Sequence, residues 1–392
     1  MERGLQGNFL IISHSDEEVR AFIPKPLPPD PPVNFSGSLH ALYSDALVNL
    51  GRLDTISVLV PSPDRFIYAY LKKEALLSSM IEGTQSSLSE LFQFEASNGQ
   101  NTPSTDVAEV SNYLKAINHG VHRLSNGFPL SLRLVREMHE KLLVSGRGSS
   151  GATPGAFRRS QNWVGGTRPG NAAFVPPPAS ALMEAMGTLE KYWHDDPISS
   201  PPLIKAALSH VQFETIHPFL DGNGRLGRML ITLILHEQKV LRQPLLYLSM
   251  YFKKHREEYY QHLMNVRMNG VWEDWLEFFF LAVSETAKEA FQTVTNINRL
   301  LDDDRSRLGN LGRQSASAIR ALEGFSKRPV ASVAEIAKLA GVSIVTAAKC
   351  IGEMMEIGLL EEITGRDRDR LFCYRGFIDT LEGDMRAATD AR

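Results

Sequence analysis

One twelve-residue stretch, HPFLDGNGRLGR at residues 217–228, gathers a histidine, an aspartate, an asparagine, two arginines and three glycines. An apolar helical pattern precedes it at residues 202–216, and a second one begins at Leu226. The stretch is therefore predicted to form a helix end, a glycine-rich loop and the first turn of a new helix. Backbone N–H groups converge in such a loop, and the new helix adds the positive end of its dipole. This arrangement predicts an anion site.

The side chains of the stretch could supply a base, a metal ligand and two cations. A histidine with an ordinary pKa of about 6.5, such as His217, is suited to take a proton from a hydroxyl group. Asp221 offers a carboxylate, and Mg²⁺ is commonly held by one or two carboxylates together with phosphate oxygens. Arg225 and Arg228 are three residues apart on the predicted first turn and therefore share a face. Together these groups predict phosphoryl or nucleotidyl transfer.

Of two other phosphate-binding motifs, one is only weakly supported and the other is absent. Gly222, Gly224 and Gly227 satisfy G-x-G-x-x-G. A dinucleotide fingerprint needs a preceding strand, and here a helix is predicted instead. The chain also contains no G-x-x-x-x-G-K-[ST] sequence, so it has no P-loop.

The stretch fits the signature of Fic-domain proteins, H-x-F-x-[DE]-G-N-G-R-x-x-R, at every fixed position. Other segments between about residues 107 and 285 also resemble the Fic core, namely LSLRLVREMHEKLL, PGAFRRSQNWVGG and YFKKHREEYYQHL. The resemblance implies a mainly α fold, with a Fic-type helical core and a small β-hairpin flap. It also implies transfer of AMP from ATP to a target hydroxyl.

The resemblance assigns a role to each matched position. His217 would be the base, Asp221 would hold Mg²⁺ against the α- and β-phosphates, and Arg228 would meet the γ-phosphate. The rest of the ATP-binding stretch would be Gly222, Asn223, Gly224, Arg225, Leu226 and Gly227. A flap that docks the target's main chain would comprise Val164, Gly165, Gly166 and Thr167. Tyr259 and Tyr260 resemble residues beside the adenine pocket, although tyrosines on an amphipathic helix are equally often core residues.

A second motif lies upstream. SSMIEG at residues 78–83 fits the Fic inhibitory pattern [ST]-x-x-x-E-[GN], with Ser78 and Glu82 at its fixed positions. Glu82 ends a helix predicted over residues 63–82, where a carboxylate meets the negative end of the helix dipole and prefers a nearby cation. The resemblance offers Arg228 as that cation. Their ion pair would occupy the γ-phosphate position, which is typical of the class with an N-terminal inhibitory helix.

The composition is that of an ordinary soluble globular chain. The 392 residues are 43% hydrophobic and 22% charged, with a net charge of −3, so no basic field favours nucleic acid. Two cysteines, no signal peptide and no apolar run of about 18 residues predict a cytoplasmic protein without a membrane span. We expect an N-terminal arm (1–36, proline-dense from residue 21), a helical region with the inhibitory helix (37–105), the Fic domain (106–302) and a winged-helix domain (303–392).

Helices within these regions are predicted from the apolar periodicity at 106–124, 132–143, 179–194, 202–217, 225–238, 254–269 and 272–302. Two short apolar runs around a turn at 162–178 predict the small hairpin. In the last region, residues 332–339 and 344–355 read as a helix–turn–helix. Residues 359–363 and 371–374 read as a β-wing around GRDRDR.

The predicted recognition helix, residues 344–355, offers only Lys349 as a cation, with Glu353 nearby. In the wing, three arginines at 366, 368 and 370 alternate with two aspartates, and phosphate contacts dominate affinity for nucleic acid. DNA binding is therefore weakly supported, and protein interaction or homodimerisation is the favoured role.

The predicted function is a protein adenylyltransferase that modifies a Tyr, Thr or Ser hydroxyl on target proteins and on itself, restrained by Glu82. Three alternatives stay open: removal of AMP by a water that Glu82 positions, use of a different nucleotide or phosphodiester donor, and an ATP-sensing transcription regulator that acts through the winged helix. An intact His217 disfavours the regulator, because sensing needs no base. The target and the modified residue cannot be read from the sequence.

Overall fold

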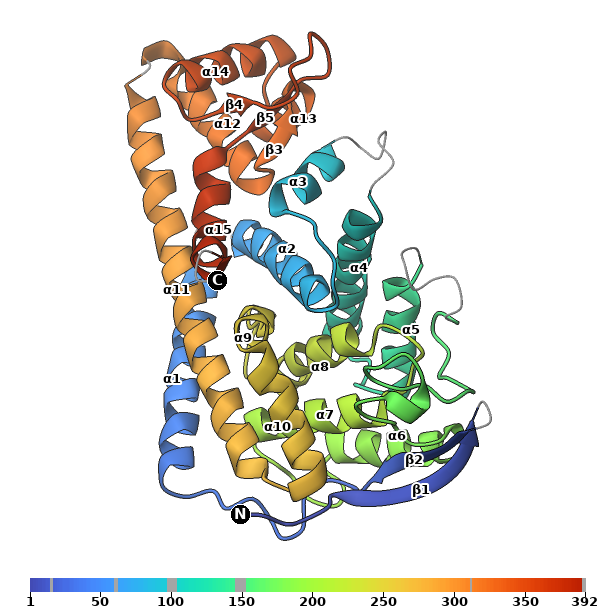
Figure 1. The fold of residues 1–392 in the computed structure, drawn as a ribbon. Coiled ribbons are helices and arrows are strands. Elements are labelled where there is room, and N and C mark those ends of the chain that lie inside the picture. The colour runs from blue at the N-terminus through green and yellow to red at the C-terminus, as the bar shows by residue number, and fades with distance from the viewer. Residues whose placement is uncertain (15–16, 60–62, 97–103, 145–152, 311, 390–392) are drawn as a thin grey trace.

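The computed structural model describes residues 1–14, 17–59, 63–96, 104–144, 153–310 and 312–389. These residues form a mainly helical fold, as predicted, with two small antiparallel sheets (Figure 1). No helix in these ranges is both long and apolar enough to cross a membrane.

The chain begins with a β-hairpin that the sequence did not predict. β1 (Gly7–His14) pairs antiparallel with β2 (Glu17–Pro24), in a register from Gly7 opposite Pro24 to His14 opposite Glu17. The N-terminal arm predicted over residues 1–36 therefore contains a paired hairpin, and the first residues of its proline-dense part, 21–24, belong to β2. The apolar run of β1 lacks the strict alternation that identifies a half-buried strand.

The centre of the molecule is built on two buried helices. Almost every residue of α7 (Pro202–Ile216) and α8 (Asn223–Glu237) is buried, which is typical of helices in the middle of a core. The two helices pack against each other, and the signature loop connects them. Around them lie α4 (Thr105–Ser125), α5 (Leu132–Leu142) and α6 (Ala179–Trp193). Ser104 and Ser131 cap α4 and α5, since each side chain accepts the backbone N–H of the third residue of its helix.

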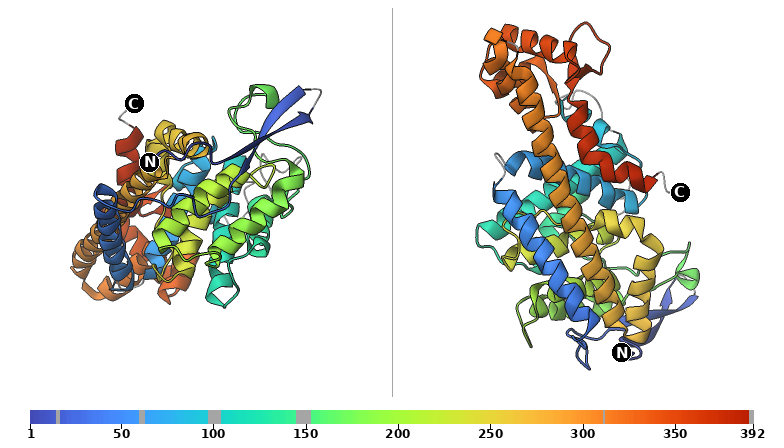
Figure 2. Two further views of the ribbon diagram at one scale, coloured as in Figure 1. Left: turned by 90° about the horizontal axis from the view of Figure 1, so that it is seen from below. Right: turned by 90° about the vertical axis from the view of Figure 1, so that its left-hand side faces the viewer.

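Helices from both sides of the signature in the sequence enclose this centre. α1 (Ser38–Leu59) runs along α11 (Trp272–Gly309), and α2 (Pro63–Ile81) lies against α4, α8 and α9 (Ser249–Lys254). The short α3 (Leu88–Ala96) follows α2, and α10 (Arg256–Asn269) precedes α11. The helix predicted to end at residue 302 continues to Gly309, so the expected domain boundary falls inside α11 (Figure 2).

The last segment forms a unit of helices and a three-stranded sheet. After the single turn η2 (Gly312–Gln314) come α12 (Ser315–Lys327), β3 (Val330–Ser332), α13 (Val333–Ala340) and α14 (Ile344–Glu356). β4 (Glu361–Glu362) and β5 (Leu371–Cys373) follow, and the sheet order is β3-β5-β4. The final helix, α15 (Arg375–Thr389), turns back to contact α11, α2 and α3 (Figure 1). The unit therefore packs against helices from both sides of the signature in the sequence.

Candidate active site

The signature loop begins and ends in left-handed backbone. α7 stops at Ile216 because His217 adopts φ 48° and ψ 61°, which is uncommon for a residue other than glycine. Gly222, with φ 78°, caps the start of α8 in the same region. A residue held in this conformation needs support from its surroundings.

Side-chain amides supply much of that support. The Asn223 amide donates to the Phe219 carbonyl and accepts the Phe219 N–H, both at 2.8 Å. Asn162 donates to the carbonyls of His217 and Phe219, at 3.2 and 2.8 Å, and Arg158 Nε donates to the His217 carbonyl at 3.0 Å. The backbone of His217 is therefore fixed from the flap segment, and the amide of Asn223, predicted to contact phosphate, is used to build the loop.

A second histidine holds the other end of the loop. His139 on α5 stacks on Phe219, with ring centroids 3.6 Å apart. Its Nδ1 accepts the Gly155 N–H at 2.9 Å, so Nε2 carries the proton and donates to the Asp221 carbonyl at 3.0 Å. Burial lowers the pKa of His139 to about 4, which keeps this ring neutral. His139 therefore holds the backbone of Asp221, the residue predicted to bind the metal ion.

The His217 side chain lies at the surface of the loop and is 18% exposed. Its Nδ1 atom is buried and has no hydrogen-bond partner among the described residues. Burial and the nearby charge of Arg267 lower the pKa of His217 to about 4. The imidazole is consequently neutral at physiological pH, the state that a general base requires.

The two arginines of the motif reach different elements, although they are three residues apart. Arg225 is buried against α4, with Nη1 3.3 Å from Glu109 Oε2 and Nη2 3.6 Å from Asp221 Oδ1. Arg228 points to the end of α2, where Nε donates to Ser78 Oγ and Nη2 to the Ser78 carbonyl, both at 2.8 Å. The two cations thus contact different helices from the first turns of α8.

Glu82 lies over the same turn. Its Oε1 accepts from Arg228 Nη2 at 2.8 Å and lies so close to Gly224 that a β-carbon there would be 2.3 Å away. Burial opposes ionisation of Glu82, but the Arg228 charge outweighs it and holds the pKa of Glu82 below its usual value. Burial likewise disfavours the charge on Arg228, but the attraction of Glu82 outweighs this effect of burial and raises the pKa of Arg228. A carboxylate therefore occupies the anion cradle that the sequence predicts.

Asp221 is accessible in the loop, with 42% of its side chain exposed. Its Oδ1 accepts the Gly222 N–H at 2.6 Å. Among the described residues no three His, Cys, Asp or Glu side chains come together as a metal site. A single accessible carboxylate beside an anion cradle does fit a Mg²⁺ ion that takes its other ligands from phosphate and water.

The predicted flap is a turn closed by one bridge, not a longer ladder. Val164 pairs with Phe174, and Gly165 and Gly166 have φ of 68° and 72°. The Asn171 side chain accepts the Thr167 N–H at 3.0 Å, within a tip that contains the short turn η1 (Pro169–Asn171). The flap continues into the N-terminal hairpin, since the Phe22 N–H of β2 donates to the Val175 carbonyl at 2.9 Å.

The two predicted adenine-site tyrosines differ in their positions. Tyr259 is 1% exposed, and its hydroxyl is 2.8 Å from Nε2 of His210. The other ring nitrogen of His210, Nδ1, is 3.0 Å from the Gly227 carbonyl oxygen. Tyr260 is 40% exposed. Only Tyr260 is open to a ligand in this structure, while Tyr259 packs in the core behind the loop.

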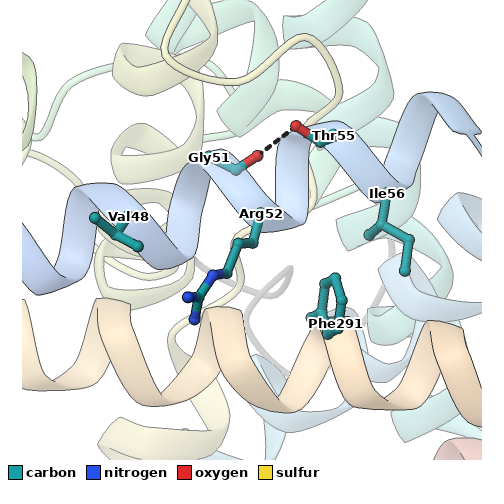
Figure 3. A pocket seen from close by; sticks show the side chains of 6 residues that line it. All are labelled: Val48, Gly51, Arg52, Thr55, Ile56 and Phe291. Carbon is teal, nitrogen blue, oxygen red and sulfur yellow. Dashed lines mark hydrogen bonds between the residues drawn. The ribbon is translucent and has the colours of Figure 1, made fainter.

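A separate pocket of about 630 Å³ lies between α1 and α11, lined by Val48, Gly51, Arg52, Thr55, Ile56 and Phe291 (Figure 3). Its walls are mostly apolar and share no residue with the signature or the inhibitory motif. They offer no base and no metal ligand, so this pocket is not the site of the predicted chemistry.

The structure therefore brings His217, Asp221, Arg228 and Glu82 to one place, together with the root of the flap. Sequence reasoning missed Asn162, Arg158, His139 and Glu109, which support the site. Asn162 and Arg158 lie in the quoted segment PGAFRRSQNWVGG, but nothing in that segment says which backbone groups they bind.

The fold and the site define a helical domain with a glycine-rich loop that a carboxylate just after α2 covers. Residues 129–235 match the Fic/DOC family, and residues 40–122 match the Fic/DOC family N-terminal region. The chain is 33% identical to the protein adenylyltransferase Fic of Drosophila erecta, and 36% identical to that of Drosophila virilis, over 107 residues in each case. The signature, the geometry and these matches agree, and the chain is a Fic-domain protein.

Each of those two matches covers 27% of this chain and 20% of the relative, so the chain spans about a fifth of the relatives' length. Solved structures extend the likeness of the fold. A Fic family protein from Desulfovibrio desulfuricans has a TM-score of 0.56 and 21% identity, covering 88% of this chain and 97% of its own. A Fic domain containing signaling protein from Bacteroides thetaiotaomicron has a TM-score of 0.51 and 18% identity, covering 66% and 97%.

Proposed function

We propose that this chain is a protein adenylyltransferase that moves AMP from ATP to a hydroxyl side chain of a target protein, or of itself, and that Glu82 restrains it. The observation that carries the proposal is the ion pair between Glu82 and Arg228 inside the anion cradle of the signature loop. A site that must be kept occupied by a carboxylate of its own chain is a site built for a charged ligand.

The proposed reaction is an in-line displacement. Neutral His217 takes the proton of a Tyr, Thr or Ser hydroxyl, and the oxygen attacks the α-phosphorus of ATP. The new O–P bond forms as the bond from the α-phosphorus to the bridging oxygen breaks, and pyrophosphate leaves. Catalysis in such transfers comes mostly from placement and from compensation of charge. The backbone from Gly222 to Gly224 and the start of α8 are suited to the phosphates.

The residues present also fit a divalent cation. Asp221 would hold Mg²⁺, which would neutralise phosphate charge when bound. Arg228, once released from Glu82, is placed to meet the γ-phosphate. The flap from Val164 to Thr167 is proposed to take the target's main chain, because it directly follows Asn162, whose amide holds the backbone of His217.

The test uses the full chain with ATP labelled at the α-phosphate, Mg²⁺ and a cell lysate as a source of targets. Mass spectrometry should find peptides carrying one AMP on a hydroxyl side chain, both in the lysate and in the chain itself. Loss of AMP from previously modified peptides would instead support the removal reaction. Absence of label with the parent and with a Glu82→Gly variant would end the proposal.

We also propose that residues 315–374 form a winged helix that binds protein. The unit has the element order of that fold, and the first turn of α14 exposes two β-branched residues, Ile344 at 62% and Val345 at 80%. A nucleic-acid surface would place cations there. A gel shift with genomic fragments that persists at about 200 mM salt would contradict the protein-binding assignment.

A further inference from the structure

Glu214 is a buried carboxyl group beside the base that the proposed reaction leaves without a role. It lies on the last turn of α7, three residues before His217, and its side chain is 9% exposed. Oε2 is 3.9 Å from His217 Nδ1, and both Oε1 and that Nδ1 are buried without a hydrogen-bond partner among the described residues. The unpaired ring nitrogen therefore lies a short gap from Oε2 of a carboxyl group whose other oxygen, Oε1, is itself unpaired, although a buried polar group without a partner is costly.

The surrounding residues leave space for this carboxyl group. A β-carbon on Gly227 would come within 2.4 Å of Glu214 Oε1, so the glycine of the signature makes room for the side chain. His210 is one turn earlier on α7 and faces the same backbone, with Nδ1 3.0 Å from the Gly227 carbonyl. One face of α7 thus carries His210, Glu214 and His217 against the start of α8.

We propose that Glu214 is a positioning residue for His217: its carboxylate accepts the Nδ1 proton of the neutral ring and thereby leaves the Nε2 lone pair free for the acceptor hydroxyl. The inference rests on the proposed adenylyl transfer. When Nε2 takes the hydroxyl proton, the positively charged ring stays paired with the carboxylate, and no second proton moves. The gap of 3.9 Å closes when substrates order the loop, since catalytic hydrogen bonds are often long in ligand-free structures.

The protonation state of Glu214 selects the ring tautomer. An ionised Glu214 accepts from Nδ1–H, whereas a protonated Glu214 would donate to Nδ1 and place the ring proton on Nε2, where it blocks the base. Burial raises the pKa of Glu214 to about 7. Arg228 on α8 and Arg267 on α10 favour the ionised form, and Glu82 after α2 opposes it. The hydroxyls of Tyr259 and Tyr260 on α10 also lie near this carboxyl group, and burial together with the charge of Glu214 raises the pKa of each.

Three variants, all made in a Glu82→Gly background, test the idea. Glu214→Gln keeps the shape, but its amide can donate to Nδ1, so kcat should fall about 10- to 100-fold with little change in the KM for ATP. Glu214→Asp should recover part of kcat. Glu74→Gln is the matched control, because Glu74 is also buried, has a pKa that burial raises to about 7, and instead accepts from Tyr113 and Ser249.

The pH profile separates positioning from a merely structural role. Between about pH 5 and 9, kcat should rise through a step in the background protein and in the Glu74→Gln variant. The step should lie below about pH 7, because the Glu82 charge that raises the pKa of Glu214 is removed, and it should be absent from Glu214→Gln. An unchanged kcat and profile in Glu214→Gln would overturn the inference. An inactive Glu82→Gly background would instead overturn the proposed function.

If Glu214→Gln does not fold, the ring of His217 can be measured in a protein that keeps Glu214. Nitrogen-15 NMR of the histidines, with His217 assigned by its loss in His217→Ala, reports which ring nitrogen carries the proton. The Nδ1–H tautomer should dominate above about pH 7. An Nε2–H tautomer across the whole range would overturn the inference. The Glu214 backbone carbonyl also acts on the ring and raises its pKa, and the substitutions leave that carbonyl in place.

Discussion

If the proposed restraint by Glu82 is correct, replacing Glu82 by glycine should raise the rate of self-modification, because it removes the carboxylate that is paired with Arg228. The contact is one charge-assisted hydrogen bond of 2.8 Å, in which the arginine side chain is 3% exposed and the glutamate side chain 37%. A hydrogen bond to a charged group contributes about 1.5–3 kcal/mol. Partial exposure of Glu82 places this contact in the lower half of that range, at about 1.5–2 kcal/mol. Since about 1.4 kcal/mol is a tenfold change, the ATP-competent population should rise by about 10- to 30-fold.

The assay is the initial rate of incorporation of label from ATP labelled at the α-phosphate, with saturating Mg²⁺. Two neighbouring serines provide a graded comparison. Ser78→Ala removes the hydrogen bond to Arg228 Nε and should raise the rate by about two- to fivefold, as expected for a weaker neutral contact. Ser79→Ala is the control, since its buried hydroxyl has no hydrogen-bond partner among the described residues and does not touch Arg228. The reasoning is refuted if Glu82→Gly binds ATP as the parent does and is no faster.

The remaining predictions concern the base, the cation, the loop and pH. His217→Ala in the Glu82→Gly background should lower the rate of self-modification by at least about 100-fold without changing nucleotide affinity measured by calorimetry. Asp221→Asn should raise the Mg²⁺ concentration needed for half-maximal rate by about tenfold, and equal Mg²⁺ titrations of variant and parent would argue against its role as a ligand. Asn162→Ala leaves two carbonyls of the loop short of a donor and should lower the melting temperature and kcat together, the first by an amount equivalent to about 1–3 kcal/mol. Near pH 5.5, three histidines that are neutral in the fold should gain protons on unfolding, namely His139, His210 and His217. Two glutamates whose pKa is raised to about 7 in the fold, Glu74 and Glu214, should lose protons. Unfolding should therefore take up about one net proton, and the melting temperature should fall as the pH is lowered.

The helix–loop–helix that carries the signature was predictable, because it is formed by consecutive residues of the chain. The apolar periodicity of residues 202–216, the turn residues that follow and the renewed periodicity after Leu226 define a helix, a loop and a helix, and the structure has α7, the loop and α8 at those places. The N-terminal hairpin was not predictable in the same way. β1 carries an apolar run without alternation, and what makes it a strand is its pairing with β2 and the contact of β2 with the flap at Val175.

By itself, the sequence determined the chemistry of the loop: a base at His217, a carboxylate at Asp221 and cations at Arg225 and Arg228, all within twelve residues. Only the tertiary structure decided how those groups are used. It divided the two arginines between α4 and α2 and brought Glu82 to Arg228 across 146 residues of chain. It also left Glu214 unpaired beside the base. The helix, loop and helix of the signature follow from residues that are neighbours along the chain, whereas the partner of a buried charge depends on which helices pack against it.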